Sequence, residues 1–142
     1  MKILVPVDGS PASIRAVKLA IAQVKKGSGA SLMILNIQDL ATRVLPTIAR
    51  ALSTAWIEDA IKSAAEEALQ DAVTVCREAG IAYLTRWEQG AIAVTIDRVA
   101  RDEDVAQIIM GTRGLGGLSG LLLGSVSTQV LQLADVPVTL VK

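Results

Sequence analysis

Short apolar runs rich in Val, Ile and Leu alternate along this chain with longer segments of helical periodicity. The runs predict strands at Lys2–Asp8, Ser31–Ile37, Ile81–Glu88, Asp104–Met110 and Val138–Val141. The segments between them predict helices at Ala12–Lys26, Ala55–Ala79, Gly90–Asp102 and Ser125–Ala134. Strands that alternate with helices favour a parallel sheet with helices on both faces, joined by right-handed crossovers. We therefore expect one open α/β domain over residues 1–142.

The composition fits such a core and excludes several kinds of chemistry. Apolar residues make up 51% of the chain but aromatic residues only 2%, so the core must consist of Val, Ile, Leu and Ala. The chain has no His, which excludes a Ser-His-Asp triad, a His general base and a His-ligated metal. The single cysteine, Cys76, excludes an intrachain disulfide and a cysteine zinc cluster, and we expect it to be a buried structural thiol.

Charge and hydropathy set the expected surroundings of the protein. Fourteen basic and fourteen acidic residues give a formal net charge of zero, so no footprint for nucleic acid is expected. The first residues lead directly into a strand pattern rather than a signal peptide. No run reaches the roughly 18 apolar residues of a membrane span. We expect a cytoplasmic protein that binds neither nucleic acid nor membrane.

The glycine-rich stretch Gly111–Ser125 is the segment that predicts a ligand site. It starts at the carboxyl end of the fourth predicted strand, where open α/β sheets bind ligands, and it ends at a helix start. Glycines let backbone amides approach an anion, and a helix N-terminus favours phosphate. No Gly-Lys-Ser/Thr is present, so the stretch is not a P-loop, and its spacing does not match the dinucleotide fingerprint.

The glycine spacing does match G-x2-G-x9-G-(S/T), with Gly111, Gly114, Gly124 and Ser125 at the fixed positions. The chain also opens with ILVPVDGS and closes with GSVSTQVLQLADVPVTLV. Over its whole length it resembles the universal stress protein family, in the branch that binds ATP. The resemblance implies a Rossmann-like sheet with strand order 3-2-1-4-5, in which the first and fourth strands are neighbours and their ends face one crevice.

The resemblance also implies roles for individual residues around ATP, or around ADP or AMP, with or without Mg²⁺ on the phosphates. The adenosine side comprises Pro6, Val7, Asp8 and the backbone of Ile37, with Gly111 near the ribose; the phosphates lie against Gly114, Gly124, Ser125 and Val126. Arg113 either pairs with phosphate or is an exposed arginine. Asp8 either contacts ribose or a metal, or only forms the turn before Gly9. Arg43 and Arg50 reach the site only if their irregular stretch folds over it.

We expect binding rather than turnover, because the loop has one Arg, no Lys and no His around it, whereas fast phosphoryl transfer needs a base, a cationic clamp and an ordered Mg²⁺. The favoured function is ATP binding in a regulatory or stress-response role. The alternatives are a slow ATP hydrolase using Asp8 and Ser125, and an interaction module without nucleotide. The resemblance further implies a homodimer formed through the last strand, Val136–Val141.

Overall fold

The computed structural model describes residues 1–27, 29–40, 54–114 and 123–142. The strands are β1 (Lys2–Pro6), β2 (Ser31–Gln38), β3 (Tyr83–Gln89), β4 (Gln107–Gly111) and β5 (Val138–Val141). The helices are α1 (Pro11–Lys25), α4 (Thr54–Ala79), α5 (Ile92–Asp102) and α6 (Ser125–Leu133). The strands form one parallel sheet in the order β3-β2-β1-β4-β5, which confirms the α/β fold and the expected order.

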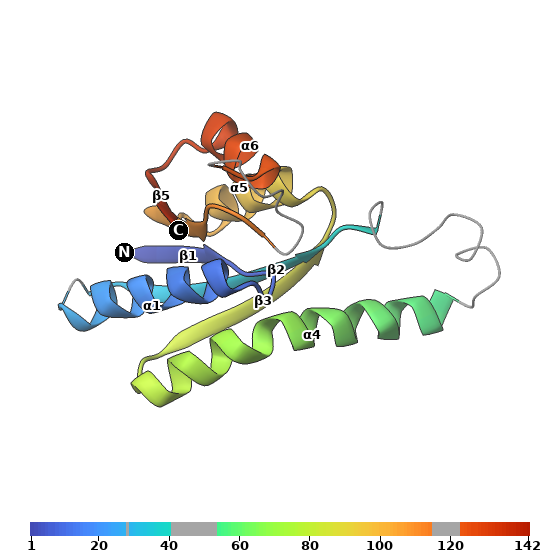
Figure 1. Cartoon of the computed structure of the whole chain (residues 1–142), viewed down its shortest axis with the longest axis horizontal. Coiled ribbons are helices and arrows are strands. Elements are labelled where there is room, and N and C mark those ends of the chain that lie inside the picture. Colours follow the sequence, from blue (N-terminus) through green and yellow to red (C-terminus); the bar gives the residue numbers. More distant parts are fainter. Residues whose placement is uncertain (28, 41–53, 115–122) are drawn as a thin grey trace.

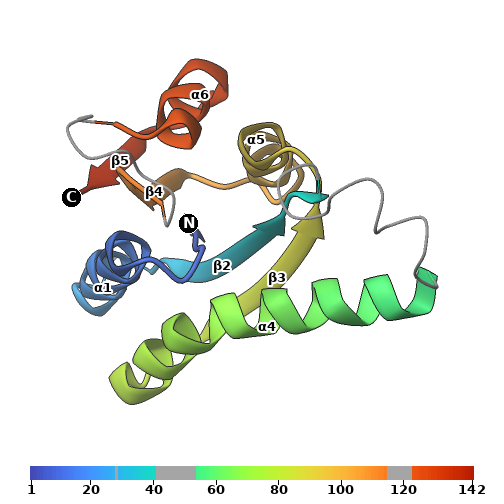
Figure 2. The same cartoon turned by 45° about the vertical axis from the view of Figure 1, so that its right-hand side comes forward.

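Helices cover both faces of this sheet (Figures 1 and 2). Helices α1 and α4 lie on one face, and α5 and α6 lie on the other. Successive residues of β1 therefore contribute to different cores: Ile3 and Val5 pack towards α1 and α4, whereas Leu4 packs towards α5 and α6. All three are fully buried, and each such side chain stabilises the fold by about 1.5–3 kcal/mol. This two-sided burial explains why the central strands are almost continuously apolar.

Two strands begin later than the sequence pattern predicts, because the preceding helices use the intervening residues for their C-terminal caps. Gly80 ends α4 with φ 68°, and the N–H of Ile81 donates back to the carbonyl of Cys76. Asp104 ends α5 in the same way with φ 49°, and the N–H of Val105 donates to the carbonyl of Ala100 at 2.9 Å. Both arrangements satisfy carbonyls at the end of a helix. The strands can start only after these caps.

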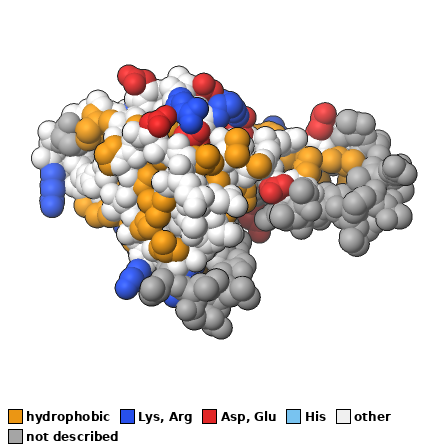
Figure 3. All heavy atoms as spheres, turned by 90° about the horizontal axis from the view of Figure 1, so that it is seen from above, with side chains coloured by type: hydrophobic (Ala, Val, Ile, Leu, Met, Phe, Trp, Pro, Cys, Tyr) orange, Lys and Arg blue, Asp and Glu red, His pale blue; other side chains and the backbone are white. Residues whose placement is uncertain are grey.

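A network of ion pairs links α5 to the amino end of β1 and to the edge strand β3. Glu103 accepts from Lys2 at 2.7 Å and from Arg86 at 2.9 Å, and Arg98 donates to Glu88 at 2.9 Å. The hydrogen bond from Lys2 is the main cause that lowers the pKa of Glu103, and the positive charges of Lys2 and Arg86 lower this pKa further. Figure 3 looks onto the side of α5 and α6 and shows acidic and basic side chains next to one another rather than a field of one sign.

No helix among the described residues is both long enough and apolar enough to cross a membrane.

The expected buried position of Cys76 is confirmed, because its side chain is fully buried on α4. Burial raises the pKa of its thiol to about 11.

Candidate functional site

A cavity of about 630 Å³ lies at the carboxyl ends of β1, β2 and β4. The residues that the family resemblance places around the nucleotide all contribute to its wall, namely Pro6, Val7, Asp8, Ile37, Gly111, Arg113, Gly114, Gly124, Ser125 and Val126. These residues come from four separate stretches of the chain. The strand order brings them together, because β1 lies between β2 and β4 and the chain leaves all three strands at the same edge of the sheet.

The turn after β1 joins the cavity to the start of α1. The Asp8 carboxylate accepts the N–H of Ser10 at 2.9 Å, and Gly9 between them has φ 81°. Ser10 is the N-cap of α1, and its hydroxyl accepts the N–H of Ser13 at 3.2 Å. Asp8 therefore forms the turn, as one of its two expected roles required, and its side chain also lines the cavity.

The protein's own packing requires glycine at Gly111, and at Gly114 an added Cβ would displace the Asp8 side chain. A Cβ on Gly111 would lie 2.8 Å from the Cβ of Ala12, in the first turn of α1. A Cβ on Gly114 would lie 2.5 Å from the Asp8 Oδ2 atom. Both distances are shorter than a normal contact of about 3.5–4.0 Å. The motif glycines thus allow β4 and the residues after it to approach the turn that follows β1.

The two halves of the glycine motif are tied together by the backbone carbonyl of Thr112. This carbonyl accepts the N–H of Gly124 at 2.6 Å and the hydroxyl of Ser127 at 2.8 Å. Thr112 also donates its own N–H to Val141 at 2.8 Å, which extends the pairing of β4 with β5. The start of α6 is therefore held at the end of β4. Residues 115–122 of the predicted loop lie outside the described residues, as do Arg43 and Arg50.

The N-terminus of α6 differs from that of α1 in its capping. Ser10 caps α1, whereas the N-cap of α6 is Gly124, which has no side chain, and no side-chain cap bond is found there among the described residues. The first N–H groups of α6 therefore have no capping oxygen from that position, and the helix dipole favours negative charge beside them. Ser125 and Val126 bring this helix end to the cavity wall. The arrangement is suited to bind an anion.

The family model described as the universal stress protein family matches residues 1–142. A universal stress protein of Methanocaldococcus jannaschii is 32% identical over 143 residues, and the match covers 99% of this chain and 81% of that protein. The chain belongs to the universal stress protein family. The expected family is thereby confirmed.

Solved structures support the same fold for this universal stress protein. The structure of hypothetical protein MJ0577 superposes with a TM-score of 0.83 at 26% identity, over 99% of this chain and 94% of that one. A universal stress protein solved in complex with cAMP has a TM-score of 0.71 at 25% identity, over 100% of this chain and 97% of that one.

Sequence reasoning missed two buried amide side chains at the end of β2. Asn36 donates from Nδ2 to the carbonyl of Val7 at 2.8 Å, and Gln38 donates from Nε2 to the Asn36 Oδ1 atom at 2.6 Å. Asn36 is 2% exposed and Gln38 is 4% exposed, and both line the cavity of this universal stress protein. Their signal in the sequence was weak, because polar residues after an apolar run usually mark the start of a loop.

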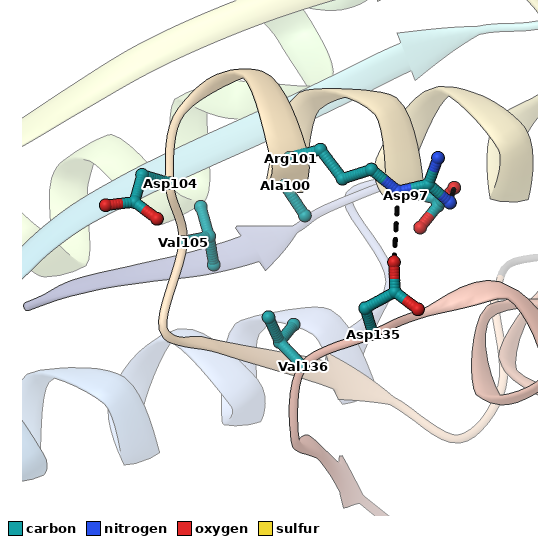
Figure 4. Close-up of a pocket in the computed structure, with 7 residues that line it drawn as sticks. All are labelled: Asp97, Ala100, Arg101, Asp104, Val105, Asp135 and Val136. Atoms are coloured by element: carbon teal, nitrogen blue, oxygen red, sulfur yellow. Dashed lines mark hydrogen bonds and ion pairs between the residues drawn. The ribbon is translucent and has the colours of Figure 1, made fainter.

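A second, smaller cavity of about 250 Å³ lies between α5 and the turn before β5 (Figure 4). Arg101 is central to it and pairs with Asp97 on its own helix and with Asp135 at 3.3 Å. The guanidinium thus links α5 to the turn after α6, which is a structural role. Among the described residues there is no group of three or more acidic or cysteine side chains placed to hold a metal ion. The larger cavity is therefore the candidate functional site.

Proposed function

We propose that this universal stress protein binds an adenine nucleotide, with ATP as the preferred ligand, in the cavity at the ends of β1, β2 and β4. The observation that carries the proposal is the convergence of both halves of the glycine motif on one cavity with the uncapped N-terminus of α6. The cavity volume of about 630 Å³ lies within the range of about 300–1,000 Å³ that small-molecule sites occupy. The related protein solved with cAMP supports the adenine part of the ligand.

The proposed orientation places the phosphates at α6 and the base at β2. The N–H groups of Ser125 and Val126, together with Gly114 and Gly124, would hold the phosphates, because the positive end of the helix dipole lies there. Arg113 lines the same cavity and would add a charge-assisted hydrogen bond to a phosphate oxygen. Pro6, Val7 and Asp8 would line the adenosine side, Gly111 would lie near the ribose, and the backbone of Ile37 would contact the base.

Mg²⁺ in this proposal arrives on the nucleotide and neutralises phosphate charge. Asp8 is the carboxylate of the cavity closest to Gly114, so it is the residue that would face such an ion. The protein's own contribution is to bind and orient the nucleotide. Binding stabilises the fold that holds the ligand, by about 2.7 kcal/mol at a ligand concentration of 100 times Kd. A bound nucleotide can therefore act as a regulatory or stress-response signal without being consumed.

Slow ATP hydrolysis is a second candidate function, favoured by the position of the Asp8 carboxylate in the cavity wall. Asp8 would orient a water molecule towards the terminal phosphate. Purified protein would then release ADP slowly, and Asp8→Asn would lower the hydrolysis rate measured at saturating ATP. A rate that survives this substitution unchanged would remove Asp8 from the mechanism.

We further propose that residues 1–142 act as one universal stress protein domain that forms a cytoplasmic homodimer through Val136–Val141. Strand β5 is at the edge of the described sheet, and all four of its residues are only half-buried. An edge strand of this kind is suited to pair with its symmetry mate across a two-fold axis. Sedimentation at micromolar concentration should give the mass of two chains, and a single-chain mass would contradict the dimer.

A pair of charge variants tests the nucleotide site. Ser125→Glu places a carboxylate at the first residue of α6, where it is favourable for the helix but repels phosphate. Calorimetric titration should show ATP binding to the wild type and a loss of at least tenfold in affinity for Ser125→Glu. Gln129→Glu is the matched control, because Gln129 is exposed one turn further along the same helix. Equal ATP affinity in all three proteins would contradict the site, and mass spectrometry of ligand released from fresh protein identifies the nucleotide.

A further inference from the structure

The pairing of β1 with β2 stops at Leu35, two residues before Ile37. In a parallel sheet, the N–H and C=O groups of alternate residues point to opposite neighbouring strands. The backbone groups of Leu35 point towards β1, because its carbonyl accepts the N–H of Val7 at 2.8 Å. Those of Gln38 point towards β3, because its carbonyl accepts the N–H of Gly90 at 3.2 Å. The backbone N–H and C=O of Ile37 therefore point to the β1 side, at the level where β1 has ended and the cavity begins.

The next rung of a regular ladder would be a bond from the N–H of Ile37 to the carbonyl of Val7. The side chain of Asn36 occupies that carbonyl instead, at 2.8 Å. Gln38 fixes the orientation of the Asn36 amide, because it donates to the Asn36 Oδ1 atom at 2.6 Å and leaves Nδ2 to face Val7. Within the described residues, no hydrogen bond from the N–H of Ile37 to a backbone carbonyl is found on the β1 side.

The consequence is a backbone donor and a backbone acceptor that face the cavity from one residue. Adenine presents an acceptor at N1 beside a donor at N6, which complements an N–H beside a C=O. Guanine presents a donor at N1 and an acceptor at O6, so it would place donor against donor. A site built to hydrogen-bond one pattern rejects the other strongly, because its polar groups are then left unpaired.

We propose that Asn36, oriented by Gln38, is a positioning residue that determines base specificity, because it holds the Val7 carbonyl and leaves the backbone of Ile37 to an adenine base. The inference rests on the proposed nucleotide site. It assigns to the buried amide pair a role beyond stabilising the fold. Removal of the Asn36 amide lets the N–H of Ile37 bond to Val7, and the cavity loses the donor that distinguishes adenine.

The binding test uses Asn36→Leu, which is close in size to Asn but cannot donate. The probes are ATP and 1-deaza-ATP, in which a CH group replaces the N1 acceptor. The wild type should bind ATP about tenfold more tightly than 1-deaza-ATP, the effect of one hydrogen bond. In Asn36→Leu the ratio should fall to about one. Weaker binding of both probes with the tenfold ratio preserved would show a structural role only and overturn the proposal.

Gln107→Leu is the matched control for the loss of an amide. Gln107 lies at the opposite end of β4, where its Nε2 donates to Thr139 at 2.8 Å. This variant should keep the wild-type ratio of the two probes. If it changes the ratio as Asn36→Leu does, the effect belongs to general loosening of the sheet, and the inference fails.

Amide hydrogen exchange tests the same inference without nucleotide and with the wild type alone. The Ile37 amide should exchange at least tenfold faster than the Leu35 amide of the same strand, because only Leu35 lies within the pairing with β1. Asn36→Leu, or Gln38→Leu if the first variant does not fold, should slow exchange at Ile37. Slow exchange at Ile37 in the wild type would overturn the inference. Failure of the wild type to bind either probe would instead count against the proposed function, and exchange would still decide the role of Asn36.

Discussion

Replacement of Gly111 by Ala should destabilise the fold by about 1–3 kcal/mol, the usual cost of inserting a carbon into a packed site. The new Cβ would lie 2.8 Å from the Cβ of Ala12, 3.0 Å from the Ala12 carbonyl carbon and 3.1 Å from the nitrogen of Ser13. Two of these three atoms are backbone in the first turn of α1, which Ser10 caps. These backbone atoms cannot move aside by a side-chain rotation, so α1 must shift relative to β4.

Urea denaturation followed by circular dichroism measures the loss, and the melting temperature should fall by about 3–10 °C for a chain of this size. Ala12→Gly provides the test of cause, because it removes the nearest contact. The double variant should be more stable than the sum of the two single effects by at least about 0.5 kcal/mol. A Gly111→Ala protein within about 0.5 kcal/mol of the wild type, or strict additivity in the cycle, would refute the argument from close approach.

Ser127→Ala removes the hydroxyl that donates to Thr112 at 2.8 Å and should lower the free energy of unfolding by about 0.5–1.5 kcal/mol in urea denaturation; no change would mean that Gly124 alone holds α6 at β4. Glu103→Gln should destabilise the protein at pH 7, because the hydrogen bond from Lys2 lowers the pKa of Glu103 in the folded state. That contribution is fully present above the unfolded pKa of about 4.5 and is lost as the pH falls through the lowered folded pKa. The stability difference between the two proteins should therefore shrink as the pH falls below 4.5, and a difference that keeps its pH 7 size under acid would contradict the ion pair. Cys76, buried and with its pKa raised to about 11, should react with a thiol reagent only when the protein unfolds; fast labelling of native protein would show that α4 opens.

The sequence was sufficient for the architecture because its central strands are buried on both faces. Continuous apolar runs such as Ile3–Val5 and Leu32–Leu35 have few alternatives to a covered parallel strand. The order of the strands was not available from periodicity and came from the family resemblance. The starts of β3 and β4 were placed too early, because Ile81 and Val105 are apolar residues that the preceding helix caps use.

The candidate site was predictable where it depends on residue type at fixed spacing. Gly111, Gly114 and Gly124 were found in this way, and the close approach to Ala12 and Asp8 gives a physical reason for two of them. Asn36 and the Thr112 carbonyl were not predictable, because their roles depend on which groups the folded chain brings together. A side-chain amide on a backbone carbonyl 29 positions away leaves no local pattern in the sequence.

The central claim is that an adenine nucleotide occupies the cavity with its phosphates at the start of α6. Titration of ¹⁵N-labelled protein with ATP, followed by amide chemical shifts, tests it most directly. The account predicts saturable shifts at Gly114, Gly124, Ser125 and Ile37. It predicts none at Gly80, which precedes the amino end of β3 and so lies at the opposite end of the sheet from the cavity. Absence of shifts at millimolar ATP, or shifts that leave the start of α6 unchanged, would contradict it.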